Sequence, residues 1–236
     1  LVEGVRRRAS RPSLATGESA AGLQREWFKV GLALFLILVF MYLLTRTDLL
    51  LVGSLLGQEA VGMYGAASKL ATTVSFAFFA VNAAGAPVIS SLFAADDREG
   101  LHRMVRRTSR WVFWPALAIA VGLAILGRPI LGLFGEEFRD AYGVMLILSG
   151  GYLATASMGL SSSLLNLTGN ERLSALSFGI AVLLNLTLNL LLIPRLGIEG
   201  AALATMLSMA AWSVVAYLLA RRKLGVNPFV LGGSPR

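Results

Sequence analysis

Three charged side chains interrupt apolar stretches of this sequence. Arg46 and Asp48 lie in one stretch, and Lys69 lies in the next. A charge inside a bilayer costs roughly 2.5–3.5 kcal/mol on insertion scales, so such a group normally faces a partner or a water-filled cavity. A turn expected at residues 57–62 brings the three together. Either they line a cavity, where the bases attract an anion and the acid balances or couples to a cation, or they form an ion pair that clamps two helices.

Three asparagines form a second set of polar side chains in apolar surroundings. Asn185 and Asn189 are four residues apart and therefore share one face of a helix. Buried amides in membranes mostly bond to neighbouring helices, at about 0.6 kcal/mol on average, so we favour a structural role over substrate contact for this pair. Asn82 stands beside Gly85 and Pro87, where we expect the helix to break. Because a broken helix needs protein or water beside it, Asn82 is the better candidate to face a substrate.

A basic cluster occupies the charged segment at residues 95–110. Its members are Arg103, Arg106, Arg107 and Arg110. Apolar residues at helical spacing in the same segment predict a separate helix that lies along the membrane surface. The cluster then anchors this helix to anionic lipids, at about 1 kcal/mol per charge, or captures an anionic head group there.

The sequence contains no recognisable catalytic or metal centre. It has no cysteine and a single histidine, His102, so a thiolate or histidine metal site is not expected. Glu136, Glu137 and Asp140 form an acidic group, which we interpret as the polar start of a helix. We therefore expect neither an enzyme nor a metal or organic cofactor.

Membrane-spanning helices must position these side chains. The 236 residues are 56% hydrophobic and 14% charged, whereas a soluble domain is about 25% charged. The apolar residues fall in runs of about twenty, the length that crosses a bilayer core as a helix. The sequence predicts an all-α integral membrane protein, a bundle with a cytoplasmic segment at 1–26, a transmembrane lobe at 27–220 and a basic tail at 221–236. Its six spans are expected at about 28–56, 61–93, 111–127, 141–165, 173–193 and 200–220.

The distribution of basic residues predicts the orientation of these spans. The formal net charge is +8, but the charges lie at the edges of the apolar runs, which argues against a nucleic-acid partner. With the N-terminal segment inside, the inner segments hold sixteen Lys and Arg residues and the outer loops hold four. The positive-inside rule then places both ends in the cytoplasm.

Five segments, taken in order, resemble the C-terminal half of the multidrug/oligosaccharidyl-lipid/polysaccharide flippase superfamily. They read TDLLLVGSLLGQEAVGMYGAASKL, AVNAAGAPVISSLFA, GRPILGLFGEEF, LLNLTGN and LLNLTLNLLLIPRLGIEGAALAT. The similarity covers nearly all of residues 28–220, and the last segment is the most specific. Spans that are poor in acidic residues, together with the basic surface segment, look more like a polysaccharide flippase than like a drug antiporter.

This resemblance implies one lobe of a two-lobed MATE-like transporter that works by alternating access. It implies a bacterial inner-membrane protein that flips an undecaprenyl-pyrophosphate-linked glycan, with proton or sodium coupling and with Arg46 and Lys69 attracting the pyrophosphate. The expected partners are membrane lipids, an N-terminal lobe of the same protein outside this sequence, and glycan-assembly enzymes. Two alternatives are a drug or cation antiporter and a non-transporting scaffold for glycan assembly.

Overall fold

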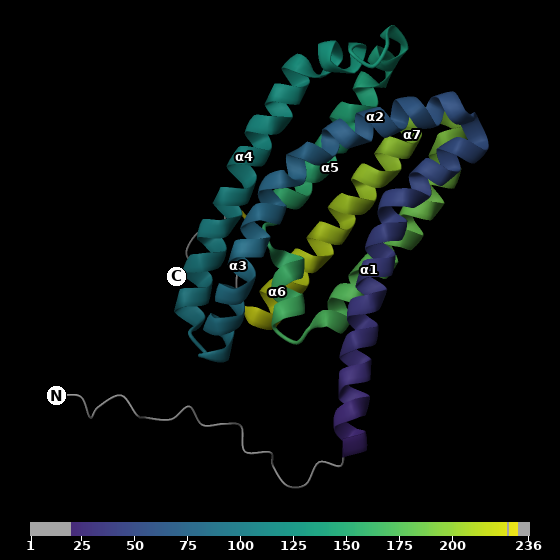
Figure 1. Ribbon diagram of the computed structural model, residues 1–236. Helices are drawn as coiled ribbons and strands as arrows, with labels where there is room; N and C mark the ends of the chain where they lie inside the picture. Colours follow the sequence, from purple (N-terminus) through teal and green to yellow (C-terminus); the bar gives the residue numbers. More distant parts are fainter. Residues whose placement is uncertain (1–19, 226, 231–236) are drawn as a thin grey trace, which may run out of the picture.

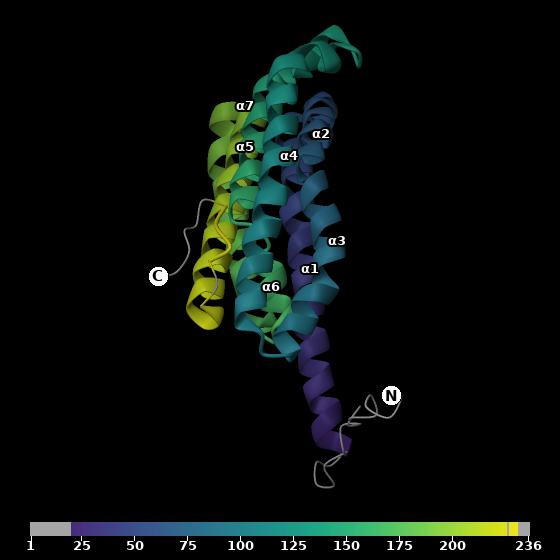
Figure 2. The ribbon, with the colours of Figure 1, turned by 90° about the vertical axis from the view of Figure 1, so that its left-hand side faces the viewer.

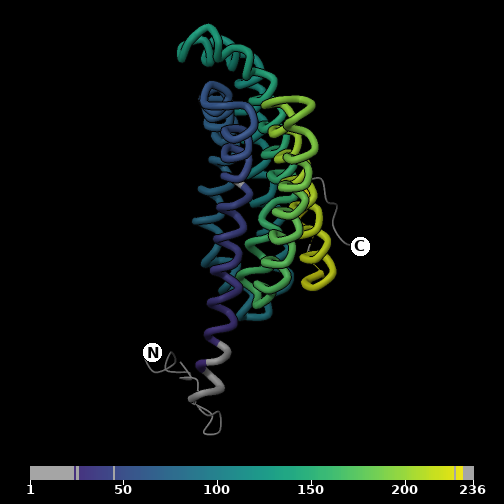
Figure 3. The backbone as a smooth tube through the Cα atoms, turned by 90° about the vertical axis from the view of Figure 1, so that its right-hand side faces the viewer, coloured from purple at the N-terminus to yellow at the C-terminus, as the bar shows by residue number. Residues whose placement is uncertain are grey.

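The computed structural model describes residues 20–225 and 227–230, and every element in these ranges is helical. Most of the predicted cytoplasmic segment 1–26 and the end of the predicted tail 221–236 lie outside the described residues. The helices run along one common direction and form an elongated bundle (Figures 1, 2 and 3).

The first part of the bundle is a helical hairpin. It consists of α1 (Ala20–Leu56) followed by α2 (Gln58–Thr72), η1 (Thr73–Ser75) and α3 (Phe76–Ala94). A single residue, Gly57, joins α1 to α2 with a φ of 93°, a conformation that glycine adopts without a steric penalty. The corner is therefore short enough to hold α1 and α2 side by side.

The helix break expected at Gly85 and Pro87 was wrong. Helix α3 continues through Pro87, and the irregular turn is η1, about ten residues earlier. Side-chain hydroxyls explain its position, because Thr72, Thr73 and Ser75 each donate to a carbonyl three or four residues back. Such bonds compete with the helical ladder and bend it.

The separate surface helix expected at residues 95–110 was also wrong. A single helix, α4 (Arg98–Gly132), contains both that segment and the third expected span. Small and apolar side chains at helical spacing, among them Leu101, Val105, Val112 and Ala116, are buried along one side of its length. This continuous stripe keeps the basic segment packed on the bundle instead of turning it along the membrane.

The fourth expected span is broken in the structure. A 3₁₀ turn, η2 (Glu136–Ala141), leads into α5 (Tyr142–Ser157), and a break of three residues separates α5 from α6 (Ser161–Leu167). The two parts are bent by 50° at the break, where Gly159 has a φ of 60°.

The last helix, α7 (Glu171–Leu224), folds back on itself. Gly197 has φ 60° and ψ −139°, which is not helical and divides α7 into two stretches. Figure 1 shows the first stretch beside α1 and the second returning next to α5. The reversal falls between the expected spans 173–193 and 200–220.

Four helices among the described residues are long and apolar enough to cross a membrane. They are Trp27–Leu56, Gln58–Ala94, Arg98–Gly132 and Glu171–Leu224, and the bent pair Glu136–Ser157 with Ser161–Leu167 makes a fifth candidate. Large apolar side chains such as Phe35, Phe76 and Ile125 remain exposed on the outer surface. A lipid-facing surface accounts for them.

Candidate functional site

A buried carboxylate joins three helical segments inside the bundle. The Asp48 side chain of α1 is 4% exposed. Its Oδ2 accepts a hydrogen bond from the Tyr64 hydroxyl of α2 at 2.5 Å and another from the Thr205 hydroxyl of α7 at 3.2 Å. Its Oδ1 accepts from the backbone N–H of Leu49 at 3.0 Å. Asp48 therefore ties α1 to both α2 and the second stretch of α7.

The network extends into the first stretch of α7. The Asn185 amide donates to Thr205 Oγ1 at 3.1 Å, and the Asn189 amide donates to Asn185 Oδ1 at 3.0 Å. The shared face predicted for the two asparagines is thus confirmed. We call the five connected side chains the polar chain; they are Tyr64, Asp48, Thr205, Asn185 and Asn189.

Every side-chain donor of the polar chain points toward Asp48. The order of donation runs from Asn189 to Asn185, then to Thr205 and then to the carboxylate, which Tyr64 meets from the other side. A buried charge is tolerated only when hydrogen bonds replace its lost hydration. At the far end, Asn189 Oδ1 is buried without a donor among the described residues. The chain thus ends in a free acceptor oxygen.

The expectation that Arg46, Asp48 and Lys69 lie together was wrong, and so was the ion pair that was one of its two alternatives. None of the ion pairs formed by described residues includes Asp48, which takes its partners from hydroxyl groups. Arg46 and Lys69 are exposed and instead line a groove between α1 and α2. The two bases therefore share a site, while the acid lies in another.

We call this site the basic groove. It has a volume of about 290 Å³, and its lining residues are Arg46, Leu49, Gly65, Ala66, Ser68, Lys69, Leu70 and Phe134. The Arg46 guanidinium also lies 5.7 Å from the centre of the Tyr42 ring. Two cationic groups over an apolar floor make a surface that suits an amphiphilic anion.

Asn82 lies apart from both sites. It is half-buried on α3, and its Oδ1 accepts no hydrogen bond from the described residues. Because the helix does not break at Gly85 and Pro87, the reason that favoured Asn82 as a substrate contact is lost. Its role stays a prediction, supported only by the unpaired amide oxygen.

The four arginines of the basic cluster lie on α4, away from its buried stripe. Arg103 pairs with Glu99 at 3.1 Å, and the Arg107 guanidinium lies 5.5 Å from the Trp111 ring centre. Arg110 is exposed and Arg106 is half-buried. These positions leave the guanidinium groups at the surface, where either of the predicted lipid roles remains open.

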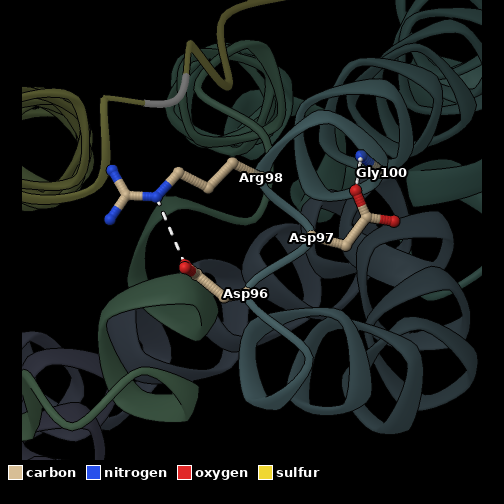
Figure 4. Close-up of polar contacts among 4 residues, drawn as sticks. All are labelled: Asp96, Asp97, Arg98 and Gly100. Atoms are coloured by element: carbon tan, nitrogen blue, oxygen red, sulfur yellow. Dashed lines mark hydrogen bonds and ion pairs between the residues drawn. The ribbon is translucent and has the colours of Figure 1, made fainter.

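The corner between α3 and α4 is held by acidic side chains. Figure 4 shows the Arg98 Nε donating to Asp96 at 3.4 Å, and Asp97 accepting the backbone N–H of Gly100 at 2.8 Å. Asp97 thereby caps the start of α4. A cleft of about 250 Å³ adjoins this corner and also includes Asn170 and Lys223. Its acids and bases nearly balance, so it offers no clear preference for one sign of ligand.

Comparison with known proteins identifies the family. Residues 33–191 match the MatE family. The chain belongs to the MatE family. The match contains Asp48, Tyr64, both asparagines of the polar chain and both bases of the basic groove, and it ends before Thr205.

Two curated relatives of this MatE chain come from Haloferax volcanii. One, named a probable low-salt glycan biosynthesis flippase Agl15, is 29% identical over 74% of this chain and 37% of its own length. Another, named a probable flippase AglR, is 30% identical over 72% of this chain and 36% of its own length. The chain therefore spans about a third of the length of the curated relatives it matches. No solved structure matches it.

Sequence reasoning missed two members of the site in this MatE chain. Tyr64 and Thr205 carry no charge, and both lie in segments that otherwise read as ordinary helix. A hydroxyl group inside an apolar stretch was the available signal, but such groups usually bond to their own helix. Only the reversal of α7 and the short corner at Gly57 reveal that both hydroxyls reach Asp48.

Proposed function

We propose that this chain is one lobe of a flippase that moves a lipid-linked oligosaccharide across a cell membrane by alternating access. The basic groove carries the proposal, together with the relatives named as flippases. A pyrophosphate carrier such as an undecaprenyl-pyrophosphate-linked glycan has a compact anionic group next to an apolar tail. Arg46 and Lys69 above apolar residues suit both parts of that ligand.

The proposed lobe crosses the inner membrane six times. This number counts the bent pair α5–α6 as one span and each stretch of α7 as another, and it is supported by the reversal at Gly197. The start of α1, the α3–α4 corner, the start of α7 and its end lie at one end of the bundle (Figure 1). These are the basic segments, so we place that end in the cytoplasm. A second lobe of the same protein then faces this one, and glycan-assembly enzymes supply the substrate.

We also propose that the polar chain couples transport to a proton or a sodium ion. Asp48 is buried without a basic partner among the described residues, so its negative charge is balanced only by hydrogen-bond donors. The Asp48 carboxylate and the Thr205 hydroxyl supply the kind of oxygen atoms that bind a hard cation. Binding of a cation or proton would weaken the links from Asp48 to α2 and α7.

Native mass spectrometry of the purified chain with undecaprenyl pyrophosphate tests the basic groove. We expect Arg46→Gln with Lys69→Gln to weaken binding at least about tenfold, because each charge-assisted contact contributes about 1.5–3 kcal/mol. The matched control is Arg128→Gln with Arg195→Gln, which removes the same charge from exposed positions at the same end of the bundle. Equal loss in both double variants would contradict a specific site.

The same measurement separates the alternatives. A drug or cation antiporter would bind hydrophobic cations, and these would not compete with the pyrophosphate lipid for the basic groove. A non-transporting scaffold would bind neither ligand. The flippase proposal requires binding of the anionic lipid together with insensitivity to the cationic compounds.

Thermal unfolding at graded sodium concentration and pH tests the coupling. A ligand that binds only the folded state raises the melting temperature with its concentration. We expect a sodium- or pH-dependent rise in the parent chain that is abolished by Asp48→Asn and kept by Asp140→Asn, which alters an exposed acid. An identical response in the parent and in Asp48→Asn would contradict the coupling role.

A further inference from the structure

The break between α5 and α6 leaves backbone groups that need partners from outside the helices. The last carbonyls of a helix have no partner within it, and irregular backbone at membrane depth is tolerated where protein covers it. Here the carbonyl of Ser157, the last residue of α5, accepts a hydrogen bond from the backbone N–H of Val230 at 3.1 Å. Residue 230 follows α7, so the segment after the last helix covers the break.

This segment is fixed to α7 at its own start. Gly225 ends α7 with a φ of 66° and turns the chain back along the bundle. The Asn227 Oδ1 then accepts from the Tyr217 hydroxyl at 3.1 Å and from the backbone N–H of Phe229 at 3.3 Å. The rings of Tyr217 and Phe229 lie 6.1 Å apart in an edge-on arrangement.

The same segment also reaches α4. The hydroxyl of Ser109, which is fully buried, donates to the carbonyl of Pro228 at 2.6 Å. Pro228 is buried as well, and Val230 is 4% exposed. Three hydrogen bonds of this segment therefore go to three different parts of the bundle, namely α4, the end of α5, and α7.

Gly159, within the break, makes this contact sterically feasible. A Cβ atom at this position would lie 2.3 Å from Ser109 Oγ and 2.7 Å from the Pro228 carbonyl oxygen. Its φ of 60° is also one that other residues rarely adopt. The break, α4 and the segment meet so closely that a single methyl group would separate them.

We propose that residues 227–230 act as a strap that locks the angle between α5 and α6, and that the strap must leave this position before the angle can change. Each hydrogen bond of the strap changes the docking equilibrium by about fivefold, so three bonds favour the docked form while still allowing release. The docking of residues 227–230 does not depend on the proposed function. Only the further step, in which release of the strap allows a movement needed for transport, rests on that function.

Thiol accessibility tests the docking, because the chain has no cysteine of its own. Single variants Val230→Cys and Lys223→Cys are placed in lipid nanodiscs and treated with a charged maleimide. Lys223 is exposed, so we expect Val230→Cys to react at least about tenfold more slowly. Equal rates would overturn the proposal.

A pair of glycine variants tests whether close packing at Gly159 is what shields residue 230 from the maleimide. Gly159→Ala adds the colliding methyl group, whereas Gly169→Ala adds the same backbone strain, at a φ of 75°, in open space. We expect Val230→Cys to react about tenfold faster in the Gly159→Ala background and at the parent rate in the Gly169→Ala background. Similar rates in the two backgrounds would overturn the proposal.

Amide hydrogen exchange tests whether the docked strap stabilises the break between α5 and α6. Ser109→Ala removes the bond between the strap and α4, and Ser208→Ala, a buried serine that bonds only within α7, is its control. We expect exchange at residues 158–161 to rise about fivefold in Ser109→Ala and to stay at the parent rate in Ser208→Ala. If Ser109→Ala exposes Val230→Cys but leaves this exchange unchanged, the strap docks without locking the break and the proposal fails.

Discussion

The polar chain and the basic groove use the same two helices in opposite ways. Arg46 and Asp48 are two residues apart on α1, and Tyr64 and Lys69 are five apart on α2. Residues at these spacings point to different sides of a helix, so the carboxylate and the phenol face inward while the two bases face outward. The bundle thus keeps a sealed, fully bonded acid next to an open basic surface. A spacing of two residues on one helix is thus enough to separate a buried hydrogen-bonded network from an exposed basic groove.

Removing the hydrogen-bond donors of the buried Asp48 carboxylate is expected to cause the largest loss of stability. Tyr64→Phe with Thr205→Val leaves the Asp48 carboxylate without side-chain partners, and we expect a loss of about 3–5 kcal/mol of unfolding free energy. Denaturant unfolding in detergent measures it. Adding Asp48→Leu should restore most of the loss, because the buried charge is then gone. A triple variant no more stable than the double would show that packing, and not the charge, causes the effect.

A smaller loss of unfolding free energy is expected when the asparagines at the other end of the polar chain are replaced. Asn185→Leu removes the donor to Thr205 and the acceptor of Asn189, so we expect a loss of about 1–2 kcal/mol. Asn189→Leu removes only the terminal amide, whose Oδ1 has no donor among the described residues, and should cost less than about 1 kcal/mol. The same unfolding assay ranks the two variants, and the reverse order would contradict the direction of the chain.

The smallest change in stability is expected in the basic groove. Arg46→Gln with Lys69→Gln alters exposed side chains, so the unfolding free energy should change by no more than about 0.5 kcal/mol. Thr187→Val, an exposed residue of α7 that bonds to its own helix, gives the baseline for a neutral change. A loss comparable to that of the Tyr64 and Thr205 variants would mean that the groove is structural after all.

Two expectations about the helices failed for a shared reason. Pro87 was expected to break its helix, and the arginine-rich segment was expected to form a helix of its own. Both expectations were inferred from the amino-acid composition of a short segment alone. In the structure, α3 continues through the exposed Pro87, with Gly85 and Ile89 on either side of it buried, and one side of α4 is buried along its length. Packing of the whole helix therefore overrides the preference of the short segment.

The sequence by itself determined that this protein is a bundle of apolar helices, because runs of about twenty apolar residues admit few other structures. It also determined which residues are costly in lipid, namely Arg46, Asp48 and Lys69, and that Asn185 and Asn189 share a face. It also placed the boundary between the last two spans within residues 193–200, where the structure has the reversal at Gly197. These conclusions need only composition and helical spacing.

Only the tertiary structure decided which partners those residues take. The Asp48 carboxylate meets Tyr64 and Thr205, which are 16 and 157 residues away along the chain, and Ser109 meets Pro228 at a separation of 119. Such contacts depend on where α7 reverses and where the chain turns back after it. Helical period fixes the face on which a side chain lies, but the packing of whole helices fixes what stands opposite that face.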